Sequence, residues 1–169
     1  AVATGVGAVL YTARVERGAS VAVIGLGGIG LNVVQGARLA GAAAIIGIDV
    51  NPARESLARR FGATHFINPQ PQSGDFVEQL RALTDGGVDY SFECVGSTKL
   101  MVHALECTHP GWGVCTTLGV PPDGEKLPIL PFELQLGRTL KGSFLGNVKT
   151  RSQLPGLLDL YAEGQINLD

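Results

Sequence analysis

Short apolar runs, many of them β-branched, alternate along the chain with longer segments in which apolar residues recur every three or four positions. The short runs are typical of strands buried on both faces, and the longer segments are typical of helices that pack against such strands. The runs predict strands over residues 21–24, 45–49, 64–67, 88–93, 114–118 and 139–144. The longer segments predict helices over residues 4–13, 29–40, 52–61, 75–83, 100–106 and 152–161.

The regular alternation of strand and helix indicates the α/β class. Right-handed crossovers between parallel strands place helices on both faces of one sheet. We therefore predict a doubly wound parallel six-stranded sheet, with residues 68–74 as a loop rich in proline, glutamine and serine. In the last helix, the inward face is expected to carry Leu154, Leu157, Leu158 and Tyr161.

A glycine-rich turn follows the first predicted strand and opens a helix. It reads Gly25-Leu26-Gly27-Gly28-Ile29-Gly30. Gly25 allows a tight turn, Gly27 removes the Cβ that would hold a pyrophosphate away from the backbone, and Gly30 lets the helix pack closely. The helix N-terminus then offers free N–H groups to phosphates. This arrangement is the fingerprint of a dinucleotide-binding, Rossmann-type domain.

A single carboxylate, Asp49, ends the second strand about twenty residues after the glycines, as the fingerprint requires. We expect it to accept hydrogen bonds from both hydroxyls of the adenosine ribose. A 2′-phosphate about 4 Å away would be repelled by on the order of 4 kcal/mol per charge pair at an intermediate dielectric, so NAD is favoured over NADP. Arg54 either bonds ribose or phosphate oxygens or is a solvated helix charge.

Ligands of doubly wound sheets lie across the carboxyl ends of the strands, so the residues that follow each strand are binding candidates. Beyond the glycine turn and Asp49, these are Asn51, Cys94, Val95, Gly96, Leu118, Gly119, Val120, Ser143, Phe144 and Leu145. The set is mostly apolar or small and contains no general acid or base. It therefore suits an adenine slot and a nicotinamide bed.

The other polar candidates have mainly structural interpretations. His65, His103 and His109 do not follow a strand at the ligand end. The spacing of Cys107, His109 and Cys115 matches no standard zinc template. Glu93 closes a buried strand, so it must face solvent or be bonded to a neighbour, and a structural role near the cofactor cleft is favoured over proton transfer.

Composition narrows the function classes. The 169 residues, 45% of them hydrophobic, suffice for one domain. A net charge of −2 gives no footprint for nucleic acid, and no uninterrupted apolar run is long enough for a membrane span. There is no signal-peptide pattern, and the three cysteines form no C-x-x-C pair. We therefore expect a cytoplasmic protein without nucleic-acid or membrane partners.

Several motifs together resemble the coenzyme domain of zinc-dependent, medium-chain alcohol dehydrogenases. They are the glycine turn and residues 46–51, 61–64, 85–96, 111–114 and 137–142. The segment 85–96, Asp-Gly-Gly-Val-Asp-Tyr-Ser-Phe-Glu-Cys-Val-Gly, is most similar to the class III, glutathione-dependent formaldehyde dehydrogenase branch. The resemblance implies hydride transfer between NAD and a primary alcohol or hydroxymethyl-thiol adduct, with zinc lowering the pKa of the bound alcohol.

The same resemblance implies roles for individual residues. Ile29 and Thr4 would lie on opposite faces of the nicotinamide, and the backbones of Leu118, Val120, Ser143 and Leu145 would hold the carboxamide region. Asp49 and Arg54 would hold the adenosine ribose, and Cys94 and Val95 would lie beside adenine. The sheet edge at residues 127–139 would form a homodimer, because an unpaired apolar edge is a liability in water.

The family's zinc ligands precede the position of Ala1, so we expect residues 1–169 to be a dinucleotide-binding domain without the catalytic zinc-binding domain. Such a fragment would bind NAD, would hold no zinc ligands and would be inactive alone. The stretch Phe144-Leu145-Gly146-Asn147 departs from the commoner family run with two glycines, which leaves class and substrate open.

Three alternatives are considered. A stand-alone, non-catalytic NAD-binding module has the same motifs. A methyltransferase that uses S-adenosylmethionine shares the glycine turn and the acid, but the third glycine and the long first helix disfavour it. A short-chain reductase is disfavoured because none of Tyr11, Tyr90 and Tyr161 has a lysine four residues later.

Overall fold

A computed structural model describes residues 1–70 and 74–167, and it contains one six-stranded sheet with the strand order β3-β2-β1-β4-β5-β6. Its described pairings are all parallel, and β1 lies between β2 and β4 with Ala22 beside Ile46 and Ser91. The strands are β1 (Ser20–Ile24), β2 (Ala44–Ile48), β3 (His65–Ile67), β4 (Tyr90–Glu93), β5 (Val114–Thr117) and β6 (Thr139–Gly142). This order confirms the doubly wound prediction.

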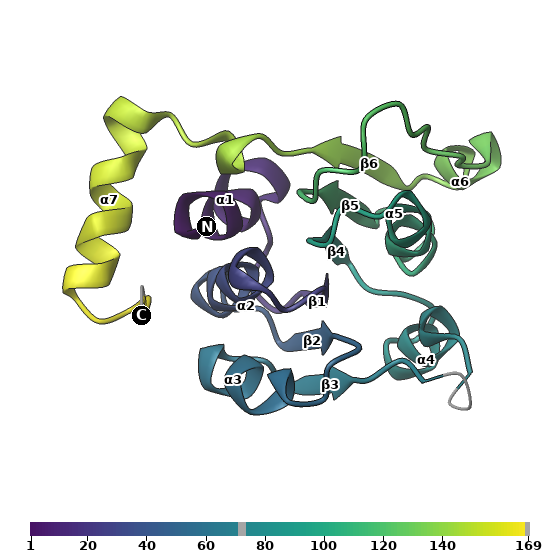
Figure 1. Ribbon diagram of the computed structural model, residues 1–169, viewed down its shortest axis with the longest axis horizontal. Coiled ribbons are helices and arrows are strands. Elements are labelled where there is room, and N and C mark those ends of the chain that lie inside the picture. The colour runs from purple at the N-terminus through teal and green to yellow at the C-terminus, as the bar shows by residue number, and fades with distance from the viewer. Residues whose placement is uncertain (71–73, 168–169) are drawn as a thin grey trace.

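Helices cover both faces of the sheet (Figure 1). On one side lie α1 (Val2–Gly7), the π-helical η1 (Ala8–Ala13), α2 (Gly28–Ala40) and α3 (Arg54–Phe61), and on the other lie α4 (Phe76–Leu83) and α5 (Thr98–Glu106). The short α6 (Pro131–Gln135) lies beside β6, and the 3-10 turn η2 (Leu145–Asn147) leads to α7 (Thr150–Ala162). Each face of the sheet has its own buried apolar cluster. No helix within the described residues has the length and apolarity needed to span a membrane.

Most predicted elements are present with bounds within two residues. The predicted N-terminal helix continues as a π-helix from Ala8 and ends at Arg14, whose φ is +58°. Helix α3 begins at Arg54 and not at Pro52, because the Asn51 side chain accepts a bond from the Ala53 N–H at 3.0 Å and forms a turn there. The predicted loop over 68–74 includes residues 71–73, which lie outside the described residues.

The prediction for the last helix is partly wrong. Leu157 is buried at 3% exposure, whereas Leu154, Leu158 and Tyr161 are 38%, 57% and 42% exposed. Helix α7 lies beyond α1 and α2, outside the two layers that flank the sheet (Figure 1), and Leu157 is the buried one of these four side chains. The segment after it returns to α2, where Gln35 exchanges bonds of 2.9 and 3.1 Å with the backbone of Asn167.

Candidate functional site

A cavity of about 660 Å³ opens at the carboxyl ends of β1, β2 and β4, the edge where the sequence predicts a ligand. We call it the strand-end cavity. Of the predicted site residues, it brings together Gly25, Gly27, Asp49, Asn51, Arg54, Cys94 and Val95. The remaining lining residues are Ile24, Ile48, Val50, Pro69, Phe76, Ser97 and Leu100. The lining is therefore mostly apolar, with one carboxylate and one guanidinium.

Each of the three fingerprint glycines is needed for a different physical reason. Gly25 has a φ of +89°, a conformation that L side chains rarely adopt, so it makes the tight turn possible. A Cβ on Gly30 would lie 1.8 Å from the carbonyl oxygen of Gly25, so a side chain there would push the helix off the turn. A Cβ on Gly27 would meet no atom within 4 Å. Gly27 thus leaves open space next to the backbone.

This open space lies at the start of α2. Gly27 is the N-cap of the helix, and no side chain caps the first-turn N–H groups. Free N–H groups and the positive end of the helix dipole favour an anion at such a position. The residues present therefore fit the diphosphate of a dinucleotide.

Asp49 is held in a fixed orientation at the mouth of the cavity. Its Oδ2 accepts a bond from the Leu26 N–H and its Oδ1 accepts one from the Asn51 N–H, both at 2.8 Å. Each carboxylate oxygen can accept a further bond. Arg54 begins α3 on the same side, and its guanidinium has no hydrogen bond or ion pair to any of the described residues. The site thus offers both acceptors and a free cation.

Glu93 ends β4 next to the cavity and is fully buried. Its carboxylate accepts bonds from backbone N–H groups, so the expectation that it bonds a neighbour is confirmed and the solvent-facing alternative is wrong. Burial raises the pKa of the adjacent Cys94 thiol, and the charge of Glu93 raises it further. Cys94 therefore contributes a neutral, apolar surface to the cavity.

The other predicted site residues do not line this cavity. They are Thr4, Gly28, Ile29, Gly30, Gly96, Leu118, Gly119, Val120, Ser143, Phe144 and Leu145. Leu118 to Val120 directly follow β5, and Ser143 continues β6 through a 3.1 Å bond from its N–H to the Thr117 carbonyl. Val120 and Phe144 are 87% and 82% exposed. Residues 118–120 and 143–145 therefore lie at the carboxyl ends of β5 and β6, with Leu118 buried and Val120 and Phe144 exposed, and we call these two segments the shelf.

The sequence analysis missed several lining residues because they come from helix starts. Phe76 is the first residue of α4, Ser97 is the N-cap of α5, and Leu100 lies in the first turn of α5. In a parallel sheet, the start of each following helix lies at the same edge as the strand end. The first turn of the helix that follows each strand is therefore a further place where the sequence indicates ligand contacts.

The histidines and the remaining cysteines have structural surroundings. His103 packs edge-on against Phe76 with ring centroids 5.4 Å apart, and His109 stacks on Trp112 at 3.7 Å. Burial raises the pKa of the Cys115 thiol to about 12. Within the described residues, no group of three or more His, Cys, Asp or Glu side chains is arranged to hold a metal ion.

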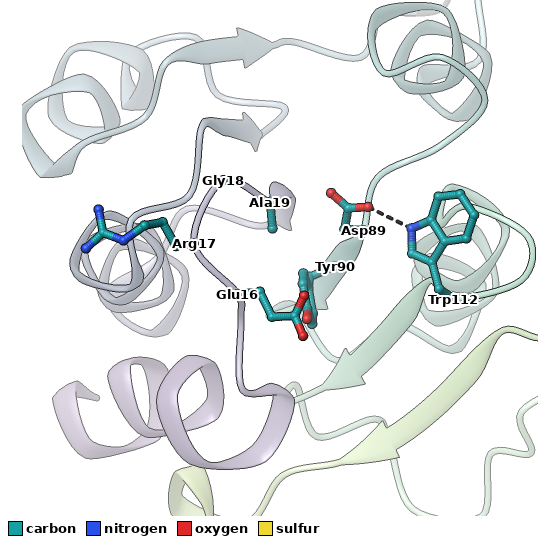
Figure 2. Close-up of a pocket in the computed structure, with 7 residues that line it drawn as sticks. All are labelled: Glu16, Arg17, Gly18, Ala19, Asp89, Tyr90 and Trp112. Carbon is teal, nitrogen blue, oxygen red and sulfur yellow. Dashed lines mark hydrogen bonds between the residues drawn. The ribbon is translucent and has the colours of Figure 1, made fainter.

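A second hollow of about 400 Å³ lies at the opposite, amino ends of β1 and β4 (Figure 2). Asp89 faces it and accepts bonds from the Ser20 N–H and hydroxyl at 2.8 and 2.9 Å and from the Trp112 indole at 2.8 Å. Burial acts to raise the pKa of Asp89, but these bonds and the nearby His109 lower it below 3.8 overall. The carboxylate thus ties two strands and a turn together.

Comparison with known proteins gives consistent matches. The family model described as zinc-binding dehydrogenase matches residues 28–163. An alcohol dehydrogenase class-3 from Cereibacter sphaeroides is 48% identical over 99% of this chain and 46% of its own length. An S-(hydroxymethyl)glutathione dehydrogenase from Synechocystis is 50% identical over 99% of this chain and 45% of its own length. The chain thus spans less than half the length of these curated relatives.

Solved structures with a similar fold point to the same family. A benzyl alcohol dehydrogenase from Acinetobacter calcoaceticus has a TM-score of 0.90 at 30% identity and covers 97% of this chain and 45% of its own. A protein described as a zinc-binding dehydrogenase from Sinorhizobium meliloti, solved with NADP bound, has a TM-score of 0.86 at 33% identity and covers 99% and 49%. The resemblance inferred from the motifs is confirmed, and the chain belongs to the zinc-binding dehydrogenase family.

Proposed function

We propose that this chain is the NAD(H)-binding domain of a zinc-assisted alcohol dehydrogenase of the class III type. The enzyme would transfer a hydride between NAD and a primary alcohol or a hydroxymethyl-thiol adduct. The observation that carries the proposal is Asp49, oriented by two backbone N–H groups at a cavity that is also lined by Gly25 and Gly27 of the glycine turn. The names of the curated relatives support the substrate class.

Each part of the cavity has a separate task in this proposal. The free N–H groups at the start of α2 would bind the diphosphate, for which Gly27 leaves room. Asp49 would accept bonds from the adenosine ribose, and Arg54 would bond a nearby ribose or phosphate oxygen. Val95 would pack against adenine. The bound nicotinamide supplies hydride chemistry, and the shelf formed by Leu118 to Val120 and Ser143 to Leu145 would orient its carboxamide.

We infer a preference for NAD over NADP from charge. A 2′-phosphate close to the Asp49 carboxylate would be repelled by several kcal/mol at an effective dielectric of about 20. Arg54 would offset part of this repulsion, so the difference in affinity between NAD and NADP should be smaller than the Asp49 carboxylate alone would produce. The NADP-bound relative has 33% identity to it, so its cofactor does not carry over directly.

Among the described residues, no three His, Cys, Asp or Glu side chains are arranged to hold a zinc ion. We propose that the zinc site, the substrate pocket and the proton path of the complete enzyme belong to parts of the protein outside residues 1–169.

We further propose a homodimer formed at the edge strand β6 and α6, where Leu130 and Phe132 are exposed. Three free cysteines favour the cytoplasm.

Calorimetric titration of the chain with NADH, NADPH and S-adenosylmethionine tests the proposal. We expect NADH to bind at least about a hundredfold more tightly than NADPH. Asp49→Asn should weaken the binding of NADH about tenfold and reduce the difference between its affinity and that of NADPH. Asp159→Asn, the same charge change on the exposed face of α7, is the matched control and should change neither affinity.

Two results would contradict this proposal. Equal affinity of the unmodified chain for NADH and NADPH would show that Asp49 does not select the cofactor. Tighter binding of S-adenosylmethionine than of NADH would move the chain to the methyltransferase class, despite its family membership.

A further inference from the structure

One carboxylate oxygen of Glu93 accepts hydrogen bonds from three backbone N–H groups in the turn that follows β4. Its Oε1 accepts bonds from the N–H groups of Val95 at 2.9 Å, Gly96 at 2.8 Å and Ser97 at 3.3 Å. Val95 and Ser97 line the strand-end cavity. Loss of a buried acceptor leaves its donors unsatisfied, which is costly. The shape of the adenine side of the cavity therefore depends on this buried side chain.

The backbone of the same residue holds the neighbouring turn, after β5. The Glu93 carbonyl accepts bonds from the N–H groups of Leu118 at 2.9 Å and Gly119 at 3.1 Å. These residues begin the shelf to which the nicotinamide side of the site is assigned. Glu93 thus bonds both turns, one through its carboxylate and the other through its carbonyl.

The two turns are also in direct steric contact. A Cβ on Gly119 would lie 2.0 Å from the Gly96 nitrogen and 2.7 Å from Oε2 of Glu93. A Cβ on Gly96 would lie 2.5 Å from the Val120 carbonyl oxygen. Oε2 is buried and has no hydrogen-bond partner among the described residues. A movement of the Glu93 side chain would therefore displace the turn after β5 as well as the turn after β4.

We propose that Glu93 is a positioning residue that sets the spacing between the adenine side and the nicotinamide side of the dinucleotide site. The inference rests on the proposed NAD(H)-binding function. It assigns no proton transfer and no contact with the cofactor to Glu93. Binding of the full dinucleotide, which must fit both turns at once, should depend on Glu93 more than binding of a ligand that occupies one side.

The test compares Glu93→Gln with Asp89→Asn, each made in the chain of residues 1–169. Asp89 is a matched control because it also holds three donors, but at the opposite ends of the strands, beside the second hollow (Figure 2). Calorimetry measures the affinities for NADH and for AMP, which occupies only the adenosine side. Urea unfolding measures the stability of each variant.

We expect Glu93→Gln to weaken NADH about tenfold and AMP by no more than about threefold, whereas Asp89→Asn changes neither although it lowers stability. Equal loss of both ligands would reduce Glu93 to a local role in the adenine pocket and overturn the inference. Unchanged NADH affinity would also overturn it. Failure of the unmodified chain to bind NADH would instead overturn the proposed function.

A measurement on the unmodified chain keeps the inference testable if Glu93→Gln does not fold. In a hydrogen–deuterium exchange experiment, saturating AMP should slow exchange at the amides of residues 95–97. It should also slow exchange at Leu118 and Gly119, which lie in the other turn, away from the proposed AMP position. Protection confined to residues 95–97 would show that the two turns move independently, and the inference would be wrong.

Discussion

The glycine turn gives the sharpest test of where a dinucleotide lies, because two of its glycines differ in their surroundings. A methyl group on Gly27 meets no atom within 4 Å, and its φ of −76° and ψ of −166° are accessible to alanine. Gly27→Ala loses some N-cap preference and gains from a less flexible unfolded chain, each by about 0.5 kcal/mol. We therefore expect the free energy of unfolding to stay within about 0.5 kcal/mol of the unmodified chain.

Gly30→Ala is the contrasting variant. Its methyl group would lie 1.8 Å from the Gly25 carbonyl oxygen, which is backbone and cannot rotate away. Overpacking of this kind costs about 1–3 kcal/mol or more, so this variant should unfold at clearly lower urea. In the Gly27 variant, the methyl group would instead occupy the space of the diphosphate and weaken NADH by about 2 kcal/mol, or roughly thirtyfold.

Urea unfolding and NADH fluorescence titration separate the two effects. The expected pattern is a stable Gly27→Ala chain with weak NADH binding and a destabilised Gly30→Ala chain. Unchanged NADH affinity in a folded Gly27→Ala chain would refute the argument, because the diphosphate could not then lie against this backbone.

Two further predictions concern stability. The pKa of Asp89 is lowered in the folded chain, so its contribution is present above about pH 4 and is lost as the pH falls through the folded value. Urea unfolding should therefore show Asp89→Asn less stable by about 1 kcal/mol at pH 7, with the gap closing as the pH falls below about 4, and a gap that persists in strong acid would contradict this. On α7, Leu157→Ala should cost about 2–3 kcal/mol and the exposed Leu158→Ala less than about 0.5, and equal costs would contradict the different burial of the two side chains.

The local pattern was sufficient for most of the fold. Strands such as β1 and β2 are β-branched, buried on both faces and bounded by glycine or aspartate, so their position depends little on distant residues. The glycine turn and Asp49 are fixed by spacing within one strand–helix–strand unit. For this reason, the strand-end cavity is lined by Gly25, Gly27 and Asp49, which the sequence singled out.

Features that depend on distant neighbours were not predictable. Helical spacing alone could not show that Leu158 and Tyr161 stay exposed, because this depends on what lies outside the layer of α1 and α2. The double role of Glu93 arises because β5 lies beside β4, which brings Leu118 and Gly119 to its carbonyl. Helical spacing also gave no sign of the change from α-helix to π-helix at Ala8.

Three carboxylates at strand ends show how position decides the use of the same chemical group. All three accept backbone N–H bonds. The bonds of Asp89 hold together the amino ends of β1 and β4. One carboxylate oxygen of Glu93 accepts bonds from three donors, and the other is buried close to Gly119. Asp49 accepts one backbone bond on each oxygen and lines a cavity. Asp49 therefore keeps acceptor capacity on both oxygens at the carboxyl ends of the strands, whereas Asp89 faces a hollow at the amino ends and its Oδ2 already accepts two bonds. For this reason, ligand selection is assigned to Asp49 and ligand-site spacing to Glu93.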